Sequence, residues 1–231
     1  MWLLCRSHNQ AGLSEMEIYL KSVPVTNRLL KSRIAGGRVL DVGGAPMPSR
    51  GTSLLANGCD VTIADPDEPK APMDPGVRHL RMRVEDLTTA LGLYDHIVLS
   101  NVLEHVESPL VAVRACMRVL EHGGQCHVLT PNCETLNRRI GVRMGILKSI
   151  REIPEKEVAI GHIHTFTVAE MRRLLEDGGL HVLECFGILL KLAPTPEMIK
   201  WPEERIQACF DIASEMPPEI CHEVYFRAVK Q

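Results

Sequence analysis

The stretch from Arg38 to Asp65 constrains the fold of this chain more than any other part of the sequence. It reads RVLDVGGAPMPSRGTSLLANGCDVTIAD. An apolar run reaches Asp41, a turn of small residues and a helix-like segment follow, and a second apolar run ends at Asp65. Two short apolar runs joined by a helix are typical of a β-α-β unit with parallel strands. A parallel sheet is therefore the first expectation.

Later segments continue this alternation. The pattern predicts further strands at 79–84, 94–100, 125–130, 180–190 and 222–230, and helices at 12–34, 49–57, 109–120 and 167–177. Pro24 is expected to interrupt the first helix. Strands alternating with helices at this spacing indicate an α/β fold with a doubly wound sheet.

Two segments interrupt the alternation, 132–163 and 193–221. We interpret them as additions around a site, the first of them lid-like. The chain is then expected to form a single domain over 1–231, with an N-terminal helical segment at 1–36.

The composition is that of an ordinary soluble protein. Hydrophobic residues make up 45% of the chain, charged residues 24%, and the net charge is -3. No basic field therefore favours nucleic acid, and no apolar run approaches the ~20 residues that span a bilayer. The eight cysteines form no Cys-x-x-Cys pair. Reduced thiols in a cytoplasmic protein, without a signal peptide or a membrane partner, are expected.

The turn after the first strand argues against a nicotinamide cofactor. The dinucleotide fingerprint needs Gly-x-Gly-x-x-Gly, but from Gly43 the chain reads GGAPMP. A Tyr-x-x-x-Lys motif is also absent. Asp65 nevertheless ends the second strand, where an acid can bind the two hydroxyls of a ribose. An adenosine-containing cofactor remains the expectation.

Further segments stand in a fixed order along the chain. They are VEDL from Val84, YDHIVLSNVLEHV from Tyr94, RVLEHGG from Arg118 and HVLTPN from His127. With LDVGGAP and VTIADP they resemble the class I S-adenosylmethionine-dependent methyltransferases, in particular the branch with Leu-Glu-His-Val after strand four. The resemblance covers about 37–132, and a weaker match, GHIHTFTVAEMRRLLEDGGL, extends it to 180.

The resemblance implies a Rossmann-like, seven-stranded, mostly parallel sheet with an antiparallel last strand. It also implies S-adenosylmethionine as cofactor and S-adenosylhomocysteine as product. By this resemblance the methionine end would lie at Asp41, Gly43 and Ala45, the ribose at Asp65, the adenine at Glu85 or Asp86, and the sulfonium at Ser100, Asn101 and Val102. Gly44, Pro66, Leu87 and His105 complete the predicted cofactor-binding set.

The chain departs from the family in the turn itself. The family has Asp-x-Gly-x-Gly-x-Gly, whereas Ala45 and Met47 hold the second and third glycine positions here. A Cβ at position 45 narrows the room for the cofactor, and Pro46 has no N–H to donate. The turn is either remodelled or binds the cofactor weakly. The alternative is a non-catalytic methyltransferase-like partner or regulatory module.

Three histidines are the candidate catalytic groups. Methyl transfer from a sulfonium requires the enzyme to align the acceptor and to remove a proton. His105 is the first candidate base, with orientation of the loop as the alternative and Glu104 as a structural partner. His162 and His164 alternate on one face and could contact substrate, act as a base, or be plain loop residues. No third ligand is evident, so no metal is expected.

The segment Arg138–Arg151 carries five positive charges and no negative ones. It is interpreted either as a lid for an anionic acceptor or as an amphipathic surface helix. The sequence predicts O- or N-methylation of a small molecule, such as a sugar, a nucleotide-linked sugar or a natural-product intermediate, by a monomer or homodimer. RNA methylation is the third hypothesis, disfavoured by the 4% aromatic content.

Overall fold

A seven-stranded sheet forms the centre of the computed structural model, which describes residues 10–231 apart from 47 and 70, and side chains from residue 21 onward. The strands are β1 (Arg38–Val42), β2 (Asp60–Asp65), β3 (Arg78–Arg81), β4 (Tyr94–Ser100), β5 (Leu120–Pro131), β6 (Leu180–Leu189) and β7 (Glu223–Lys230). Their order is β3-β2-β1-β4-β5-β7-β6. The first five pair in parallel, and β7 runs antiparallel to β5 and β6. The predicted fold class is confirmed.

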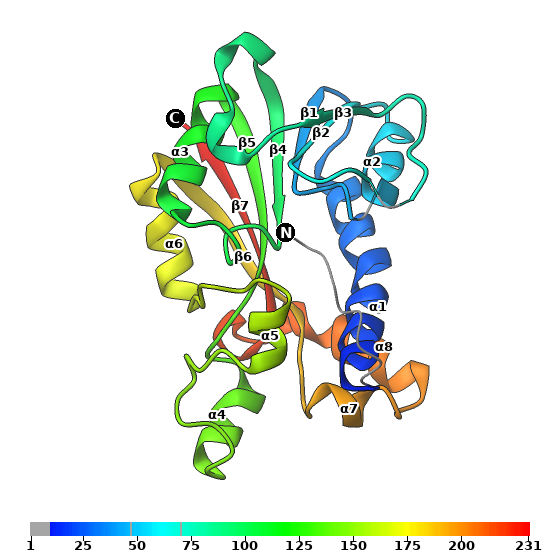
Figure 1. Cartoon of the computed structure of the whole chain (residues 1–231), viewed down its shortest axis with the longest axis vertical. Helices are drawn as coiled ribbons and strands as arrows, with labels where there is room; N and C mark the ends of the chain where they lie inside the picture. Colours follow the sequence, from blue (N-terminus) through cyan, green and yellow to red (C-terminus); the bar gives the residue numbers. More distant parts are fainter. Residues whose placement is uncertain (1–9, 47, 70) are drawn as a thin grey trace.

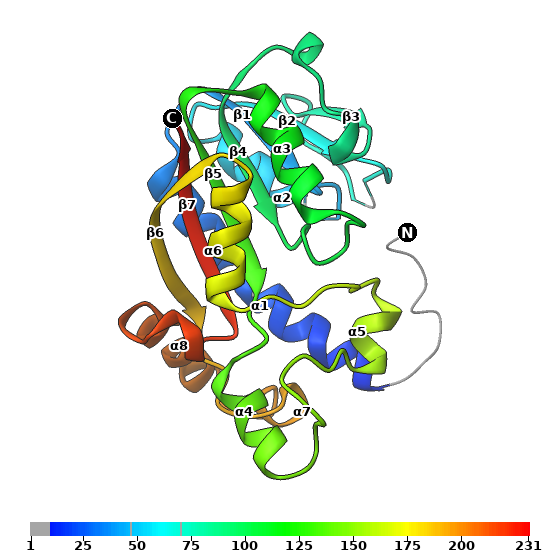
Figure 2. The same cartoon turned by 90° about the vertical axis from the view of Figure 1, so that its left-hand side faces the viewer.

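Helices cover both faces of this sheet (Figures 1 and 2). They are α1 (Gln10–Arg33), α2 (Pro48–Leu55), α3 (Pro109–Val119), α4 (Leu136–Arg143), α5 (Glu155–Ala159), α6 (Val168–Asp177), α7 (Thr195–Met198) and α8 (Glu203–Asp211). Four short 3-10 turns complete the order: η1 (Val84–Asp86), η2 (Thr89–Leu91), η3 (Ile212–Glu215) and η4 (Pro218–Ile220). Figure 2 shows α3 and α6 in front of the sheet and α1 behind it.

Two apolar cores form because successive strand residues point to opposite faces. In β1, Leu40 and Val42 pack in the core that includes Val113 of α3. Val39 packs in the core that includes Leu30 of α1 and Leu54 of α2. Burial on both faces is what makes strands of a parallel sheet read as continuous apolar runs.

Three boundaries differ from the sequence prediction. Pro24 lies inside α1 without ending it. Packing of this helix outweighs the lost backbone bond, since Leu30 and the following Ile34 are fully buried. Gly123 and Gly124 do not stop α3 but lie in the irregular start of β5, where the register to β4 shifts. The acidic segment predicted to follow the third strand forms η1, because β3 ends at Arg81.

The two interrupting segments lie beyond the carboxyl ends of the parallel strands. The first contains α4 and α5, and the second contains α7, α8, η3 and η4. The helical spacing of 138–151 extends only to Arg143, after which the chain turns. The predicted capping box of α6 is confirmed: Thr167 Oγ1 accepts a hydrogen bond from Glu170 N, and the Glu170 side chain accepts one from Thr167 N.

The seven cysteines that the structure describes are free thiols, and Cys5 and Met47 lie outside the described residues. Within 10–231, 47 and 70 excepted, no helix combines the length and the hydropathy needed to cross a bilayer.

Candidate active site

The turn after β1 packs directly against the segment that follows β4. Gly43 has φ 71° and donates its N–H to the Ala64 carbonyl oxygen at 2.9 Å. A Cβ at this position would lie 2.8 Å from Cγ2 of Val102. Only glycine combines the positive φ with this close approach, so Gly43 fixes the turn at the edge where open α/β sheets bind ligands.

Asp65 holds the same turn from the end of β2. Its Oδ2 accepts a hydrogen bond from Ala45 N at 3.2 Å, and its Oδ1 accepts one from Asp67 N at 2.9 Å. Burial raises the pKa of this carboxyl group, and the two backbone hydrogen bonds oppose the rise. Each oxygen keeps acceptor capacity beyond its one backbone partner. The predicted contact with a ribose is compatible with this arrangement.

Asp41 lies beneath the turn. It is fully buried, and its Oδ2 accepts a hydrogen bond from Nε of Arg50 at 2.8 Å. A Cβ on Gly44 would come within 2.5 Å of the same oxygen. Burial raises the pKa of Asp41 although Arg50 opposes the rise. Asp41 therefore supports the turn through an ion pair with α2.

Arg50 is a residue that the sequence analysis missed. Its signal was a charge on the apolar face of a short helix, one turn before the buried Leu54. Only 4% of Arg50 is exposed. Buried arginine needs a partner, and a search for one would have led to Asp41.

The acidic segment at residues 84–87, which we call the rim, follows β3. Arg118 donates through Nη2 to the carbonyl oxygens of Glu85 and Leu87, both at 3.2 Å. Leu87 is fully buried, whereas Asp86 is exposed. The Glu85 carboxylate accepts a hydrogen bond from Arg83 at 3.4 Å. Pro66 is also exposed, and its carbonyl oxygen accepts a hydrogen bond from Arg81 at 3.2 Å.

The segment after β4 borders a narrow polar pocket. Asn101 adopts φ 53° and donates its N–H to the Leu129 carbonyl oxygen at 2.9 Å. Eight residues line the pocket: Ser22, Val23, Thr26, Asn27, Arg50, Ser100, Asn101 and Glu223. Burial raises the pKa of Glu223 to about 7, and a hydrogen bond with the Asn101 side chain opposes this rise. Glu223 at the start of β7 was also missed by the sequence analysis.

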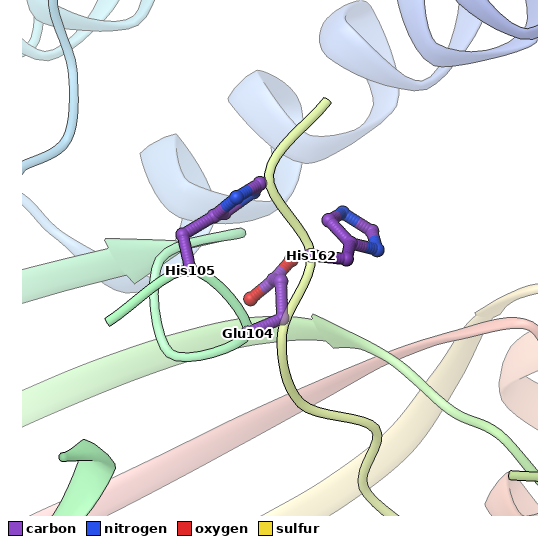
Figure 3. Close-up of side chains that lie close together, drawn as sticks. All are labelled: Glu104, His105 and His162. Atoms are coloured by element: carbon purple, nitrogen blue, oxygen red, sulfur yellow. The ribbon is translucent and has the colours of Figure 1, made fainter. Parts of the chain in front are cut away.

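Glu104, His105 and His162 gather at the same edge of the sheet (Figure 3). The rings of His105 and His162 meet edge to face, with centroids 4.7 Å apart. Burial lowers the pKa of His105 to about 4, and the nearby His162 adds to this effect. Glu104 is buried, and neither carboxylate oxygen has a hydrogen-bond partner among the described residues. Burial raises its pKa to about 7.

Backbone hydrogen bonds bring the distant segment 161–164 to this position. Ile163 N and His164 N both donate to the Glu104 carbonyl oxygen, at 2.9 and 3.2 Å. His162 Nδ1 lies 3.9 Å from Oε2 of Glu157. His164 Nε2 lies 3.0 Å from the Val106 carbonyl oxygen. The two predicted histidines therefore separate, with His162 beside His105 and His164 against the backbone.

The same three residues could hold a metal ion. One ligand atom from each of Glu104, His105 and His162 lies within 4.8 Å of the others. Carboxylate and imidazole suit several divalent cations. The pair His162 and His164 considered from the sequence does not form this set, because Glu104 and His105 join His162 in place of His164.

The comparisons with known proteins agree with this architecture. A family profile described as a methyltransferase domain matches residues 16–185. A ubiquinone biosynthesis O-methyltransferase of Dechloromonas aromatica is 33% identical over 111 residues, which are 43% of this chain and 46% of that protein. The protein of the same name in Xanthomonas axonopodis pv. citri is 30% identical over 179 residues, 72% of each chain. The chain thus aligns with less than half of the first of these relatives.

Solved structures show the same fold. An S-adenosylmethionine-dependent methyltransferase from Thermotoga maritima has a TM-score of 0.61 at 17% identity, covering 95% of this chain and 96% of that one. The magnesium protoporphyrin IX methyltransferase of Synechocystis, solved with S-adenosylhomocysteine, has a TM-score of 0.61 at 14% identity, covering 97% and 89%.

The chain therefore belongs to the methyltransferase domain family, and its resemblance to the class I S-adenosylmethionine-dependent methyltransferases is confirmed. Its residues fit that cofactor. A carboxylate ends β2 where a ribose would bind, and the turn after β1 requires glycine at position 43. The Asp41 Oδ1 atom beneath this turn is buried and has no hydrogen-bond partner among the described residues.

Proposed function

We propose that this protein transfers a methyl group from S-adenosylmethionine to a hydroxyl group of a small molecule. The observation that carries the proposal is the contact of His105 with His162, on the same sheet edge as Asp65. This arrangement supports the proposal, because it brings two imidazole rings together at the sheet edge where the cofactor is predicted to bind. The name of the relatives, ubiquinone biosynthesis O-methyltransferase, favours oxygen over nitrogen as the acceptor.

The cofactor, when bound, supplies an electrophilic methyl group, and its sulfur leaves as a neutral thioether. Asp65 binds the ribose hydroxyls through acceptor positions that its backbone partners leave open. The rim at Glu85 and Leu87 takes the adenine. His105 accepts the hydroxyl proton when the acceptor oxygen gains the methyl group. Its lowered pKa keeps the imidazole unprotonated at neutral pH, and the same shift makes it a weaker base.

The lid sequence offers fewer free cations than its composition suggests. Arg138 donates to the Ile150 carbonyl oxygen and lies 3.5 Å from the Glu157 carboxylate. Arg139 pairs with Glu134 at 3.0 Å. A further ion pair joins Arg151 to Glu170 at 2.6 Å. The arginines of this segment therefore give less reason to propose an anionic acceptor. Sugars and natural-product intermediates that carry hydroxyl groups remain within the proposal.

The first experiment is a calorimetric titration with S-adenosylmethionine and S-adenosylhomocysteine, with NADH as control. Micromolar binding of the first two alone supports the proposal. Transfer of a labelled methyl group to matched hydroxyl and amine acceptors then identifies the acceptor atom. Absence of binding by both would contradict the proposal and favour the non-catalytic module. Methylation of RNA with a steep salt dependence would favour the third hypothesis.

A further inference from the structure

The buried carboxyl group of Glu104 has no hydrogen bond that would stabilise its charge. Only 2% of this residue is exposed, and neither carboxylate oxygen has a hydrogen-bond partner among the described residues. Buried charges in proteins are normally paired with another charge or coordinate a metal ion. An unpartnered buried carboxylate therefore indicates a ligand that compensates it.

Two imidazole rings lie beside this carboxyl group. The rings of His105 and His162 meet edge to face, with centroids 4.7 Å apart. One nitrogen of each ring and one oxygen of Glu104 all lie within 4.8 Å of one another (Figure 3). In a tetrahedral site with bonds of about 2.1 Å the ligand atoms are about 3.4 Å apart. Side-chain movements of about 1 Å would therefore close the set around an ion.

Each ring also has a second partner. His105 forms a hydrogen bond with the Gly161 backbone. His162 Nδ1 lies 3.9 Å from Oε2 of Glu157, which is within ion-pairing distance. Histidines that bind metal ions in proteins normally direct their other ring nitrogen to a backbone carbonyl or a carboxylate, which fixes the orientation of the ring. Both histidines thus have the kind of outer partner that a metal-binding histidine requires.

We infer that Glu104, His105 and His162 form a binding site for a divalent transition-metal ion, with Zn²⁺ as the probe. Two imidazoles and one carboxylate are a known ligand set for Zn²⁺ and leave a fourth position for water or another ligand. Imidazole nitrogen favours Zn²⁺ over Mg²⁺, which prefers oxygen ligands. The ion would join the loop after β4 to the segment 161–164, whose backbone already donates to the Glu104 carbonyl oxygen.

One consequence of this site rests on the proposed function. An imidazole nitrogen cannot bind a metal ion and accept a proton at the same time, so Zn²⁺ on His105 should inhibit methyl transfer. Saturating Zn²⁺ should lower turnover by about a hundredfold or more, which is the loss expected when a general base is removed. A chelator should restore turnover, and stimulation of transfer by Zn²⁺ would overturn this consequence.

The site itself is tested without the cofactor, by calorimetric titration of the chelator-treated wild type with ZnCl₂. One ion should bind per chain with a micromolar or lower Kd, and MgCl₂ should bind at least about a hundredfold more weakly. Glu157→Gln should weaken Zn²⁺ by about tenfold to a hundredfold, the usual effect of losing an outer partner. His162→Ala and Glu104→Gln remove a ligand and should cost at least as much. His122→Ala, at an exposed histidine, should match the wild type.

Co²⁺ distinguishes this site from the thiols of the chain. Co²⁺ held by nitrogen and oxygen ligands absorbs in the visible region, whereas a thiolate ligand adds a charge-transfer band in the near ultraviolet. The wild type should show the visible bands without the thiolate band, and His162→Ala should lose them. Glu104→Gln conserves the size of the side chain, so it remains informative if His162→Ala folds poorly.

Several results would overturn the inference: no Zn²⁺ binding by the wild type, equal affinity in the wild type and both ligand variants, or a Co²⁺ spectrum with thiolate character. A failure of the proposed function looks different. The wild type would then bind Zn²⁺ at these three residues but would not bind S-adenosylhomocysteine.

Discussion

The proposed site has a cofactor half, at the ends of β1 and β2, and an acceptor half, around Glu104, His105 and His162, and the two halves are held together in different ways. In the cofactor half, at the ends of β1 and β2, the partners are near neighbours in sequence: Arg50 and Asp41 are 9 residues apart, and Ala45 and Asp65 are 20 apart. In the acceptor half, His164 Nε2 lies 3.0 Å from the carbonyl oxygen of Val106, a residue 58 positions away. Short connections within a β-α-β unit build the first half, whereas the second exists only after the whole sheet has formed.

The halves also differ in how their carboxylates are satisfied. Asp65 accepts two backbone hydrogen bonds, and Asp41 is paired with Arg50. Glu104 is buried without a hydrogen-bond partner for either oxygen among the residues that the structure describes. Asp41 and Asp65 thus each have at least one partner, although Asp41 Oδ1 has none among the described residues, whereas neither oxygen of Glu104 has one. The acceptor half should therefore respond more strongly to pH and to ligands.

The strongest test of this division is His105→Ala. A general base contributes about a hundredfold to ten-thousandfold to turnover, so kcat should fall by that order. Affinity for S-adenosylhomocysteine, measured by calorimetry, should fall less than turnover, and an equal loss of affinity would instead support the predicted contact of His105 with the cofactor. His162→Ala should likewise reduce turnover more than cofactor binding. His122→Ala, on an exposed position at the start of β5, serves as control, and normal turnover of His105→Ala would remove this residue as the base.

Asp65→Ala should give the opposite pattern. Loss of two hydrogen bonds that a carboxylate accepts from ribose hydroxyls costs about 3 to 6 kcal/mol, at least a hundredfold in affinity. Calorimetric titration with S-adenosylhomocysteine measures this loss. The control is Asp60→Ala, at the exposed opposite end of β2. Unchanged affinity in Asp65→Ala would exclude the ribose assignment.

Glu104→Gln should change the pH dependence of stability. The pKa of Glu104 is raised from 4.5 to about 7 in the folded protein. The folded state therefore holds a proton that the unfolded state releases, and this group's contribution to stability is lost as the pH rises from 4.5 to 7. At pH 8 the variant should be more stable than the wild type by up to about 3 kcal/mol, and near pH 4.5 the difference should disappear.

Urea denaturation of both proteins at several pH values measures this difference. Glu104→Gln keeps the size of the side chain, so packing is conserved. An equal change of stability at pH 4.5 and pH 8 would show that the carboxylate does not titrate in this window. The expected difference in pH response between the acceptor half and the cofactor half would then be absent.

The smallest expected effect concerns the helix that follows the acceptor segment. Thr167→Ala removes the N-cap of α6 and should lower the free energy of unfolding by about 1 kcal/mol. Thr88→Ala is the matched control, because Thr88 precedes η2 without a side-chain capping bond. Its effect should stay within about 0.5 kcal/mol. Equal effects of the two changes, measured by urea denaturation, would contradict the capping role.

The prediction of the first two strand ends is confirmed, since β1 ends directly before Gly43 and β2 ends at Asp65. Asp65 was placed by the apolar run that precedes it, and Gly43 by the small-residue turn. The sequence prediction missed Arg50 and Glu223, because a charged residue inside an apolar pattern indicates burial but does not indicate which residue it pairs with. Reading Gly123 and Gly124 as a helix stop was wrong, because α3 ends at Val119 and glycine can also mark an irregularity within a strand.

The sequence by itself determined the sheet, its winding and the edge at which the candidate site lies, because apolar periodicity and turn residues act over short stretches of chain. Only the tertiary structure decided which polar groups meet there. His162 rather than His164 lies beside His105, since two backbone hydrogen bonds to the Glu104 carbonyl fix the register of the 161–164 segment. Contacts between residues so far apart depend on the packing of the whole sheet, which no local pattern encodes.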